Sequence, residues 1–330
     1  IYTLSLHDAL PIYELGADIK KDAGAPSYTS VFGKALVAEA RADERIVAIT
    51  AAMRGGTGLD PFFDAFPDRA FDVGIAEENA VGMASGLAFA GMKPVVAIYS
   101  TFLQRAIDQI VIDTALSKLD VVFAIDRAGL VGADGPTHHG MFDIAYMRMI
   151  PHMRVIAPSN EVELVSALHT ALELGGPVAV RYPRSSVQGL ELPDQPEIMP
   201  YGKGDIRRDG EDIAILAFGS MVQTALKAAD LLAEQGVDAR VVDMRWAKPI
   251  DHDAVEHAAQ TKLVVTLEDG VKCGGAGEGV LDMLARIGAT TPVLVLGIDD
   301  RFVPHGTPAQ LMEAIGLDER GVCDSIMGRL

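Results

Sequence analysis

The chain has 330 residues, 49% of them hydrophobic, and its 46 acidic against 28 basic residues give a formal net charge of −18. That charge disfavours binding to nucleic acid or to an anionic membrane surface, and no apolar run in the sequence is long enough to cross a bilayer. Because two cysteines cannot form a disulfide framework in a chain of this size, we expect a cytoplasmic protein of two domains.

The N-terminal segment, residues 1–25, is set apart from the rest of the sequence. It begins IYTLSLHDALPI without an initiating methionine, and it has the features of neither a signal peptide nor an obvious transit peptide. We expect residues 1–12 to be translated sequencing adapter or a fragment junction, and residues 13–24 to be the remnant of a polar linker. The fold prediction therefore starts at residue 26.

Residues 26–184 alternate between helical and strand patterns. A helical pattern after Ser27 leads to a strand at 46–50 and a glycine-rich loop at 53–59. Further strands are expected at 72–76, 94–99, 121–126, 154–157 and 178–181. Asn160 followed by Glu163 predicts a capping box at the start of a helix over 161–174. Such alternation predicts an α/β domain whose sheet is mostly parallel and doubly wound, with helices on both faces.

The stretch from Phe71 to Gln109 is the centre of this domain. It predicts a strand that ends at Ala76 and a helix in which Glu77 occupies the first turn, with Gly91 as a left-handed cap. The carboxyl ends of strands are where open α/β sheets bind ligands, so Glu77 is placed to meet one. Taken alone, Glu77 is better explained as a helix-start carboxylate that the macrodipole favours, because such residues are common.

Residues 185–208 contain three prolines and no periodicity, which is typical of a linker. A second, smaller α/β domain is predicted over 209–330. Its strands are expected at 212–218, 240–244, 263–267 and 293–296, and its helices at 221–234, 251–259 and 277–287, with two short helices at the end. The glycine-rich turn at 274–279 does not fit a dinucleotide-binding fingerprint, so we expect this domain to serve as scaffold and dimer interface.

Two segments of the first domain carry groups suited to binding an anionic substrate. Residues 98–105, IYSTFLQR, contain Phe102, which could be an ordinary core residue, and Arg105, which could be a solvated helix arginine paired with Asp108 or Asp113. Residues 126–140, DRAGLVGADGPTHHG, combine an arginine, an aspartate and two histidines. Asp134 and His138 lie too close in an irregular loop, without a third ligand, to predict a metal site. An arginine near a histidine and an aspartate can instead bind phosphate and hydroxyl groups.

Together with Glu77, these segments resemble the pyrimidine-binding domain of thiamine-diphosphate enzymes. The resemblance is closest to the 1-deoxy-D-xylulose-5-phosphate synthase family, relatives of transketolase, and runs from about Pro26 to the C-terminus. It implies that Glu77 binds N1′ of the aminopyrimidine of thiamine diphosphate and that Phe102 packs against this ring. It also implies catalytic roles for Glu77 and His138.

The resemblance further implies an acceptor pocket. Tyr99 and Arg105 would face the substrate, Arg127 and Arg184 would bind its phosphate, and Asp134 and His138 would line the pocket. The substrates implied are pyruvate and glyceraldehyde 3-phosphate, which condense with loss of CO2 to a product used in isoprenoid, thiamine and pyridoxal biosynthesis. No role follows for His139, and Trp246 and His305 are expected to be packing or surface residues.

The family's GDG-type motif, which binds the cofactor diphosphate and Mg²⁺, does not occur in this sequence. We therefore expect no metal ligands here, the Mg²⁺ ligands in an additional N-terminal domain or separate subunit, a homodimer, and negligible activity for the chain alone. Other interpretations stay open: the C-terminal subunit of a split transketolase, the β subunit of a 2-oxoacid dehydrogenase, or a non-catalytic dimerising module.

Overall fold

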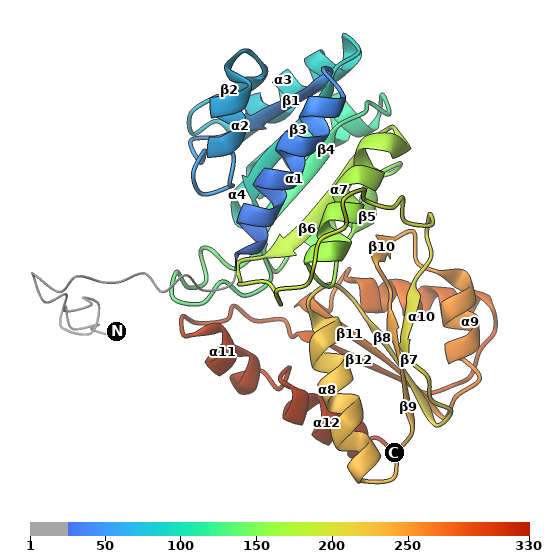
Figure 1. Ribbon diagram of the computed structural model, residues 1–330. Coiled ribbons are helices and arrows are strands. Elements are labelled where there is room, and N and C mark those ends of the chain that lie inside the picture. The colour runs from blue at the N-terminus through green and yellow to red at the C-terminus, as the bar shows by residue number, and fades with distance from the viewer. Residues whose placement is uncertain (1–25) are drawn as a thin grey trace, which may run out of the picture.

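The computed structural model describes residues 26–330, in which two sheets flanked by helices lie one above the other (Figure 1). The upper sheet has seven strands in the order β10-β5-β6-β4-β3-β1-β2. Its strands are β1 (Ile46–Thr50), β2 (Ala70–Asp72), β3 (Lys93–Tyr99), β4 (Val122–Ala128), β5 (Arg154–Ile156), β6 (Val178–Pro183) and β10 (Trp246–Lys248). All pair in parallel except β10, which runs antiparallel to β5.

The lower sheet has five strands in the order β12-β11-β8-β9-β7. They are β7 (Asp205–Arg208), β8 (Ile213–Ala217), β9 (Ala239–Asp243), β11 (Leu263–Val271) and β12 (Val293–Ile298). Only the edge strand β7 is antiparallel to its neighbour. Every residue of β1 and β8 is buried, as expected for parallel strands covered on both faces. The predicted fold class, mostly parallel α/β sheets between helices, is confirmed.

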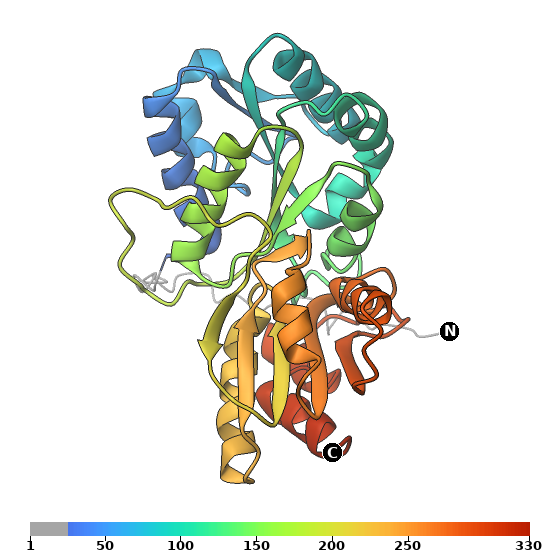
Figure 2. The same ribbon diagram turned by 90° about the vertical axis from the view of Figure 1, so that its right-hand side faces the viewer.

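Helices cover both faces of each sheet, as the two views show (Figures 1 and 2). Those of the upper half are α1 (Tyr28–Ala42), α2 (Asp60–Ala65), α3 (Glu77–Phe89), α4 (Ser100–Leu103), α5 (Ile107–Gln109), α6 (Asp143–Met149) and α7 (Glu161–Leu174), with 3-10 turns η2 (Pro67–Arg69) and η3 (Gln104–Ala106) and a π-helical segment η4 (Ile110–Ala115). Those of the lower half are α8 (Met221–Glu234), α9 (His252–Ala258), α10 (Ala276–Arg286), α11 (Pro308–Ala314) and α12 (Glu319–Met327).

The hydrophobic core is continuous across the two sheets. Apolar side chains of the upper sheet, such as Val96, share one buried cluster with Ile144 of α6, Val255 of α9 and Val280 of α10. The other faces have separate cores, one under α1 and α7 and one under α8 and α12. The two halves are therefore packed against one another through apolar contacts as well as joined by the chain.

Two local predictions were wrong, and a third is confirmed in part. The strand expected at 72–76 is instead β2 (Ala70–Asp72), because the Asp72 carboxylate accepts the N–H of Ala52 and of Gly74, and Gly74 turns at a φ of +74°. The end of the segment expected to be linker forms β7, which pairs with β9. The predicted capping box at α7 is half formed: Asn160 accepts from the Glu163 N–H, but the Glu163 carboxylate binds Arg207 and Arg245.

Other elements lie within a few residues of their predicted positions. Helix α3 begins at Glu77, and Gly91, at a φ of +90°, ends it with the predicted left-handed turn. Strand β10 was not predicted.

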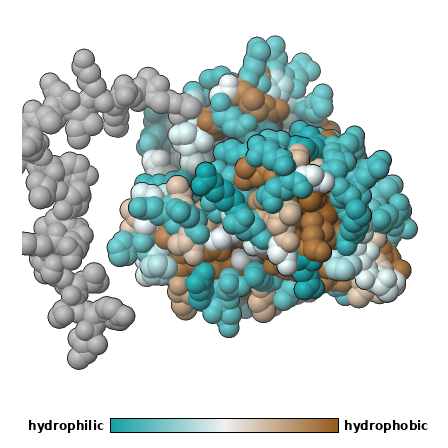
Figure 3. Space-filling view, turned by 90° about the horizontal axis from the view of Figure 1, so that it is seen from below, coloured by the Kyte–Doolittle hydropathy of each residue, from teal (hydrophilic) through white to brown (hydrophobic). Residues whose placement is uncertain are grey.

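Within residues 26–330, no helix combines the length and the apolar character that crossing a membrane requires. Seen from below, the lower half is mostly hydrophilic, with apolar residues gathered in separate patches (Figure 3). The predictions for residues 1–25 lie outside the described residues.

Candidate cofactor and substrate site

Glu77 is a buried carboxylate at the first position of α3. Its side chain is 4% exposed, and Arg105 Nη1 lies 3.6 Å from Oε2, within ion-pair distance but without a hydrogen bond. Among residues 26–330, Oε2 has no hydrogen-bond partner at all. Since a buried carboxylate oxygen without a partner is costly, the site has an acceptor that a ligand can satisfy. Arg105, which could have paired with Asp108 or Asp113, reaches towards Glu77 instead.

Two aromatic rings follow at the end of β3. The strand ends at Tyr99 and the chain turns directly into α4, so that Tyr99 and Phe102 stack with 5.6 Å between ring centroids. His138 meets the Phe102 ring edge-on at 5.5 Å. Phe102 is half-buried, and a Cβ on Gly56 would strike the Tyr99 hydroxyl, so the glycine-rich loop after β1 closes over the tyrosine.

The loop between β4 and α6 is closed at its base. Gly129 and Gly140 exchange two backbone hydrogen bonds of 2.8 and 2.7 Å. Thr101 of α4 donates to the Thr137 carbonyl at 2.8 Å, which brings the loop against the aromatic pair. The Thr137 hydroxyl is bonded to Nδ1 of His138 at 2.9 Å, leaving Nε2 as the nitrogen that can exchange a proton with a ligand.

Two arginines meet on Asp134. Arg127 Nη1 and Arg184 Nη1 both donate to Asp134 Oδ2, at 3.3 and 2.6 Å. The Arg127 guanidinium also lies over the Tyr99 ring, 3.9 Å from its centroid. The structure thus brings Tyr99, Arg127, Asp134 and Arg184 into one cluster, which continues through Phe102 to His138. Two guanidinium groups against one carboxylate leave this cluster with a positive charge, as an anion site requires.

Asp126 is a buried acid that the sequence analysis did not single out. It ends the apolar part of β4, one residue before Arg127, and it accepts a hydrogen bond from Thr29 Oγ1 at 2.7 Å. Its Oδ1 has no partner among the described residues. Burial raises the pKa of Asp126 to about 7. The available signal was weak: a single acid after an apolar run marks many strand ends.

Two groups that the sequence left without a ligand role have structural partners. His139 is buried, accepts the Val131 N–H at Nδ1 and is bonded through Nε2 to the Pro304 carbonyl at 3.1 Å, which ties the loop to the lower half just above α11 (Figure 1).

The glycine-rich turn at 274–279 binds a carboxylate of the chain itself. The Glu268 carboxylate accepts the N–H groups of Ala276 and Gly277 at 3.0 and 2.8 Å, so this helix start has its own anion.

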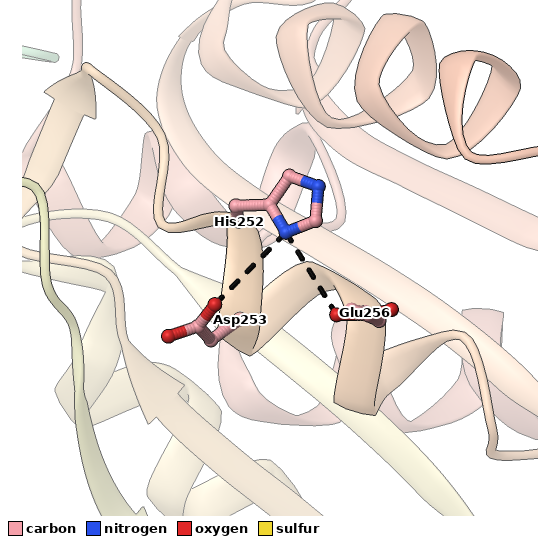
Figure 4. A group of neighbouring side chains, drawn as sticks. All are labelled: His252, Asp253 and Glu256. Atoms are coloured by element: carbon pink, nitrogen blue, oxygen red, sulfur yellow. Dashed lines mark ion pairs between the residues drawn. The ribbon is translucent and has the colours of Figure 1, made fainter.

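A group of possible metal ligands lies on α9, where His252, Asp253 and Glu256 face one another (Figure 4). Nδ1 of His252 is 4.0 Å from Asp253 and 3.8 Å from Glu256. All three are exposed, and Lys203 pairs with Asp253 at 2.5 Å. Because an ammonium group already occupies the aspartate, this group is explained as a surface ion-pair network.

The residues around Glu77 fit the pyrimidine half of thiamine diphosphate. The buried Oε2 of Glu77, which has no partner among the described residues, can hydrogen-bond a ring nitrogen through one shared proton, and the half-buried Phe102 offers a flat apolar surface to an aromatic ring. The described residues near this point include no cluster of carboxylates that would hold Mg²⁺ and a diphosphate. The fit therefore covers half of such a cofactor.

Comparison with known proteins gives a family match for each half of the chain. Residues 24–189 match the model of the transketolase pyrimidine-binding domain, and residues 202–322 match that of the transketolase C-terminal domain. The chain is 52% identical over 322 residues to the 1-deoxy-D-xylulose-5-phosphate synthase of Syntrophotalea carbinolica, covering 97% of this chain and 51% of that protein. A second synthase, from Neisseria gonorrhoeae, is 52% identical over 303 residues, which cover 92% of this chain and 47% of that protein. The chain spans about half the length of these relatives.

Among solved structures, a split-gene transketolase described as an inactive β4 tetramer matches with a TM-score of 0.82 and 33% identity. The match covers 92% of this chain and 98% of that one. A transketolase from Campylobacter jejuni matches with a TM-score of 0.77 at 20% identity, which shows the shared fold. That match covers 92% of this chain and 47% of the other.

Proposed function

Since this chain belongs to the transketolase family, as the pyrimidine-binding and C-terminal domains that form the C-terminal half of 1-deoxy-D-xylulose-5-phosphate synthases, we propose that it is part of such a synthase. The reaction condenses pyruvate with glyceraldehyde 3-phosphate and releases CO2 and 1-deoxyxylulose 5-phosphate. The observation that carries the proposal is the buried Oε2 of Glu77, which has no partner among the described residues. Thiamine diphosphate, when bound, supplies the electron sink that decarboxylation of pyruvate needs.

In this proposal Glu77 holds the pyrimidine. Its Oε2 would share a proton with N1′ and so favour the imino tautomer of the amino group on the far side of the ring, whose nitrogen can then accept a proton. Arg105, at 3.6 Å, faces the same carboxylate from a position that is 60% exposed, from which it can also reach a substrate. Phe102 packs on the ring and keeps water from one of its faces.

The cluster around Asp134 binds the acceptor. Arg127 and Arg184 are positioned by Asp134 Oδ2 before a ligand arrives, so a phosphate meets two donors whose side-chain entropy is already partly lost. The Tyr99 ring supports the Arg127 guanidinium from below. His138, with Nδ1 bonded to Thr137, offers Nε2 to a hydroxyl of the acceptor or the product as proton donor and acceptor.

Partners are proposed on the basis of exposed apolar side chains. Four large ones lie on or beside α3 and η4, which pack together: Ile75, Phe89, Ile112 and Leu116. Phe89 is 84% exposed and Ile75 77%. A second copy of the chain, or the domain that holds the diphosphate and Mg²⁺, would cover them; light scattering that gives a monomer, with and without that domain, would contradict this.

The test is complementation. The chain is mixed with the N-terminal domain of a close relative, thiamine diphosphate, Mg²⁺, pyruvate and glyceraldehyde 3-phosphate, and product formation is measured. We expect turnover only in the mixture and its loss with Glu77→Ala, while Glu78→Ala, which changes the exposed neighbour, retains it. A folded chain that stays silent in the mixture would contradict the proposal and leave a non-catalytic dimerising module.

A second candidate is the C-terminal subunit of a split transketolase. The structural match that covers 98% of a split-gene transketolase chain favours it. The two candidates differ in the donor substrate, so the same mixture is assayed with pyruvate and with a ketose phosphate. Turnover of pyruvate supports the synthase, and turnover of the ketose phosphate alone supports the split transketolase.

A further inference from the structure

A cavity of about 540 Å³ lies where the two halves of the molecule meet. Its walls come from α6 and β10, which belong to the upper layers, and from α9 and α10, which cover the lower sheet. Arg148, Lys248, His252 and Arg286 line it, and we call it the seam cavity. None of the residues of the Glu77 and Asp134 clusters lines it, so it is a separate feature of the described chain.

Two cations in its wall have no carboxylate partner. Within residues 26–330, neither Arg148 nor Lys248 lies within ion-pair distance of an acid. Arg148 donates instead to the Ala247 carbonyl, and Lys248 Nζ to the carbonyls of Arg148 and Ile150 at 2.9 and 2.5 Å. Burial lowers the pKa of both side chains, and the charge of Arg148 lowers the pKa of Lys248 further. Three lining residues are cationic (Arg148, Lys248 and Arg286) and one is a carboxylate (Asp282), an excess of positive charge that is unexpected in a chain with a net charge of −18.

The acids nearby are already engaged. Asp282, the carboxylate among the described lining residues, pairs with Arg286 at 2.8 Å. Glu268, Asp282 and Glu278 attract Arg148 from beyond ion-pair distance. Glu268 also accepts the backbone N–H groups of Ala276 and Gly277, and Glu278 accepts that of Gly274. Gly279 of α10 leaves the space that the Arg148 guanidinium occupies, since a Cβ there would collide with it. The guanidinium is therefore held by a hydrogen bond to the Ala247 carbonyl on one side, and it fits against α10 on the other because Gly279 has no side chain.

We propose that the seam cavity binds a small dianion, with a phosphate monoester as the class that fits best. The excess of two cations over carboxylates among the lining residues matches the charge of about −2 that a phosphate group carries near neutral pH. The volume lies in the range of small-molecule sites, which leaves room for the organic part of the ester. Because its walls belong to both halves, an occupant would stabilise their contact.

The experiment is a calorimetric titration of the full chain with inorganic phosphate and with glycerol 3-phosphate, at constant ionic strength set with chloride. Arg184→Gln is used as the background, because it weakens the Asp134 cluster as a second phosphate site. Lys248→Gln and Arg286→Gln are compared in that background. Lys262→Gln serves as the matched control, since Lys262 is an exposed lysine that pairs with Asp212 outside the cavity.

We expect saturable binding that weakens about tenfold or more in Lys248→Gln and measurably in Arg286→Gln, with no change in Lys262→Gln. Tighter binding of the ester than of inorganic phosphate identifies an organic occupant, whereas equal affinities identify the free anion. Absence of saturable binding to a folded chain, or equal affinity in all variants, would overturn the proposal. Arg286, which is exposed, keeps the test valid if Lys248→Gln fails to fold.

Discussion

At the scale of single residues, Asp134 has two opposed effects on an incoming anion. Its carboxylate positions Arg127 and Arg184, yet it also competes with the anion for the same guanidinium groups. In Asp134→Asn the positive charge of the cluster rises by one unit while a hydrogen-bond acceptor remains. We expect inorganic phosphate to bind this variant several-fold more tightly, as measured by titration in an Arg286→Gln background. Unchanged or weaker affinity would show that positioning outweighs competition.

Asp126 gives the second residue-level prediction, a pH dependence. Its pKa is raised from 3.8 to about 7 by burial, so the folded chain binds this proton more tightly than the unfolded chain. The contribution of protonated Asp126 to the free energy of unfolding is fully present below about pH 4 and is lost as the pH rises from about 4 to about 7. Asp126→Asn should therefore gain stability relative to the wild type between pH 5 and pH 8 in urea unfolding. An equal difference at both pH values would contradict this assignment.

Whether the sequence predicts the place of a single residue in the site depends on what holds that residue there. The proximity of Tyr99 and Arg127 follows from the rule that side chains at the carboxyl ends of parallel strands gather at one edge of the sheet. Glu77 follows it less directly, because a turn separates the end of β2 at Asp72 from the start of α3. The bond of Arg184 to Asp134 does not, because it joins residues fifty positions apart through the orientation of two long side chains. Sequence patterns do not identify Asp126 and Glu268 for another reason. Both matter because they are buried, and a single acid in a local pattern does not reveal burial.

At the scale of elements, the loop between β4 and α6 depends on Gly129. This glycine has a φ of +74°, and a Cβ would collide with the Asp269 carboxylate, which binds Arg181. We expect Gly129→Ala to lower the free energy of unfolding by more than the 1–2 kcal/mol or so that a left-handed alanine costs by itself. Gly236→Ala is the control, with a φ of +81° and open space around it. Equal losses in urea unfolding would contradict the steric argument.

Strands β7 and β10 show what local patterns cannot predict about elements. Each has three or four residues, too few for an alternation of apolar and polar side chains to stand out. Each is held by antiparallel pairing with a strand distant in the sequence, β9 for one and β5 for the other. The longer, fully buried strands and the amphipathic helices were predictable because their period extends over enough residues.

At the scale of the whole molecule, a buried charge network joins the two halves. Arg181 of β6 donates to Asp143 at 3.2 Å and to Asp269 of β11 at 2.6 Å, and all three side chains are almost fully buried. Removal of the arginine leaves two buried carboxylates without a cation. We expect Arg181→Met to lose about 3–5 kcal/mol of unfolding free energy, against little change for the exposed Lys262→Gln. A loss no larger than that of the control would contradict the role of the network.

The shared core implies one unfolding transition for both halves. Trp246, the one tryptophan of the chain, is buried in β10, which pairs with β5, so its fluorescence reports on this connection between the halves. We expect fluorescence and far-UV circular dichroism to follow the same urea midpoint. Separate midpoints would show that the contact opens before the sheets unfold.

The placement of β10 also affects how genes of this kind can be recombined. A crossover in the proline-rich segment before β7 would exchange the lower half between two relatives and, with it, an edge strand of the upper sheet. The sheet of one parent would then have to accept Trp246–Lys248 from the other. Chimaeras should tolerate this exchange only where β5 and β10 come from the same parent or match in shape. A crossover that keeps β5 and β10 from one parent should therefore give the more stable chimaera.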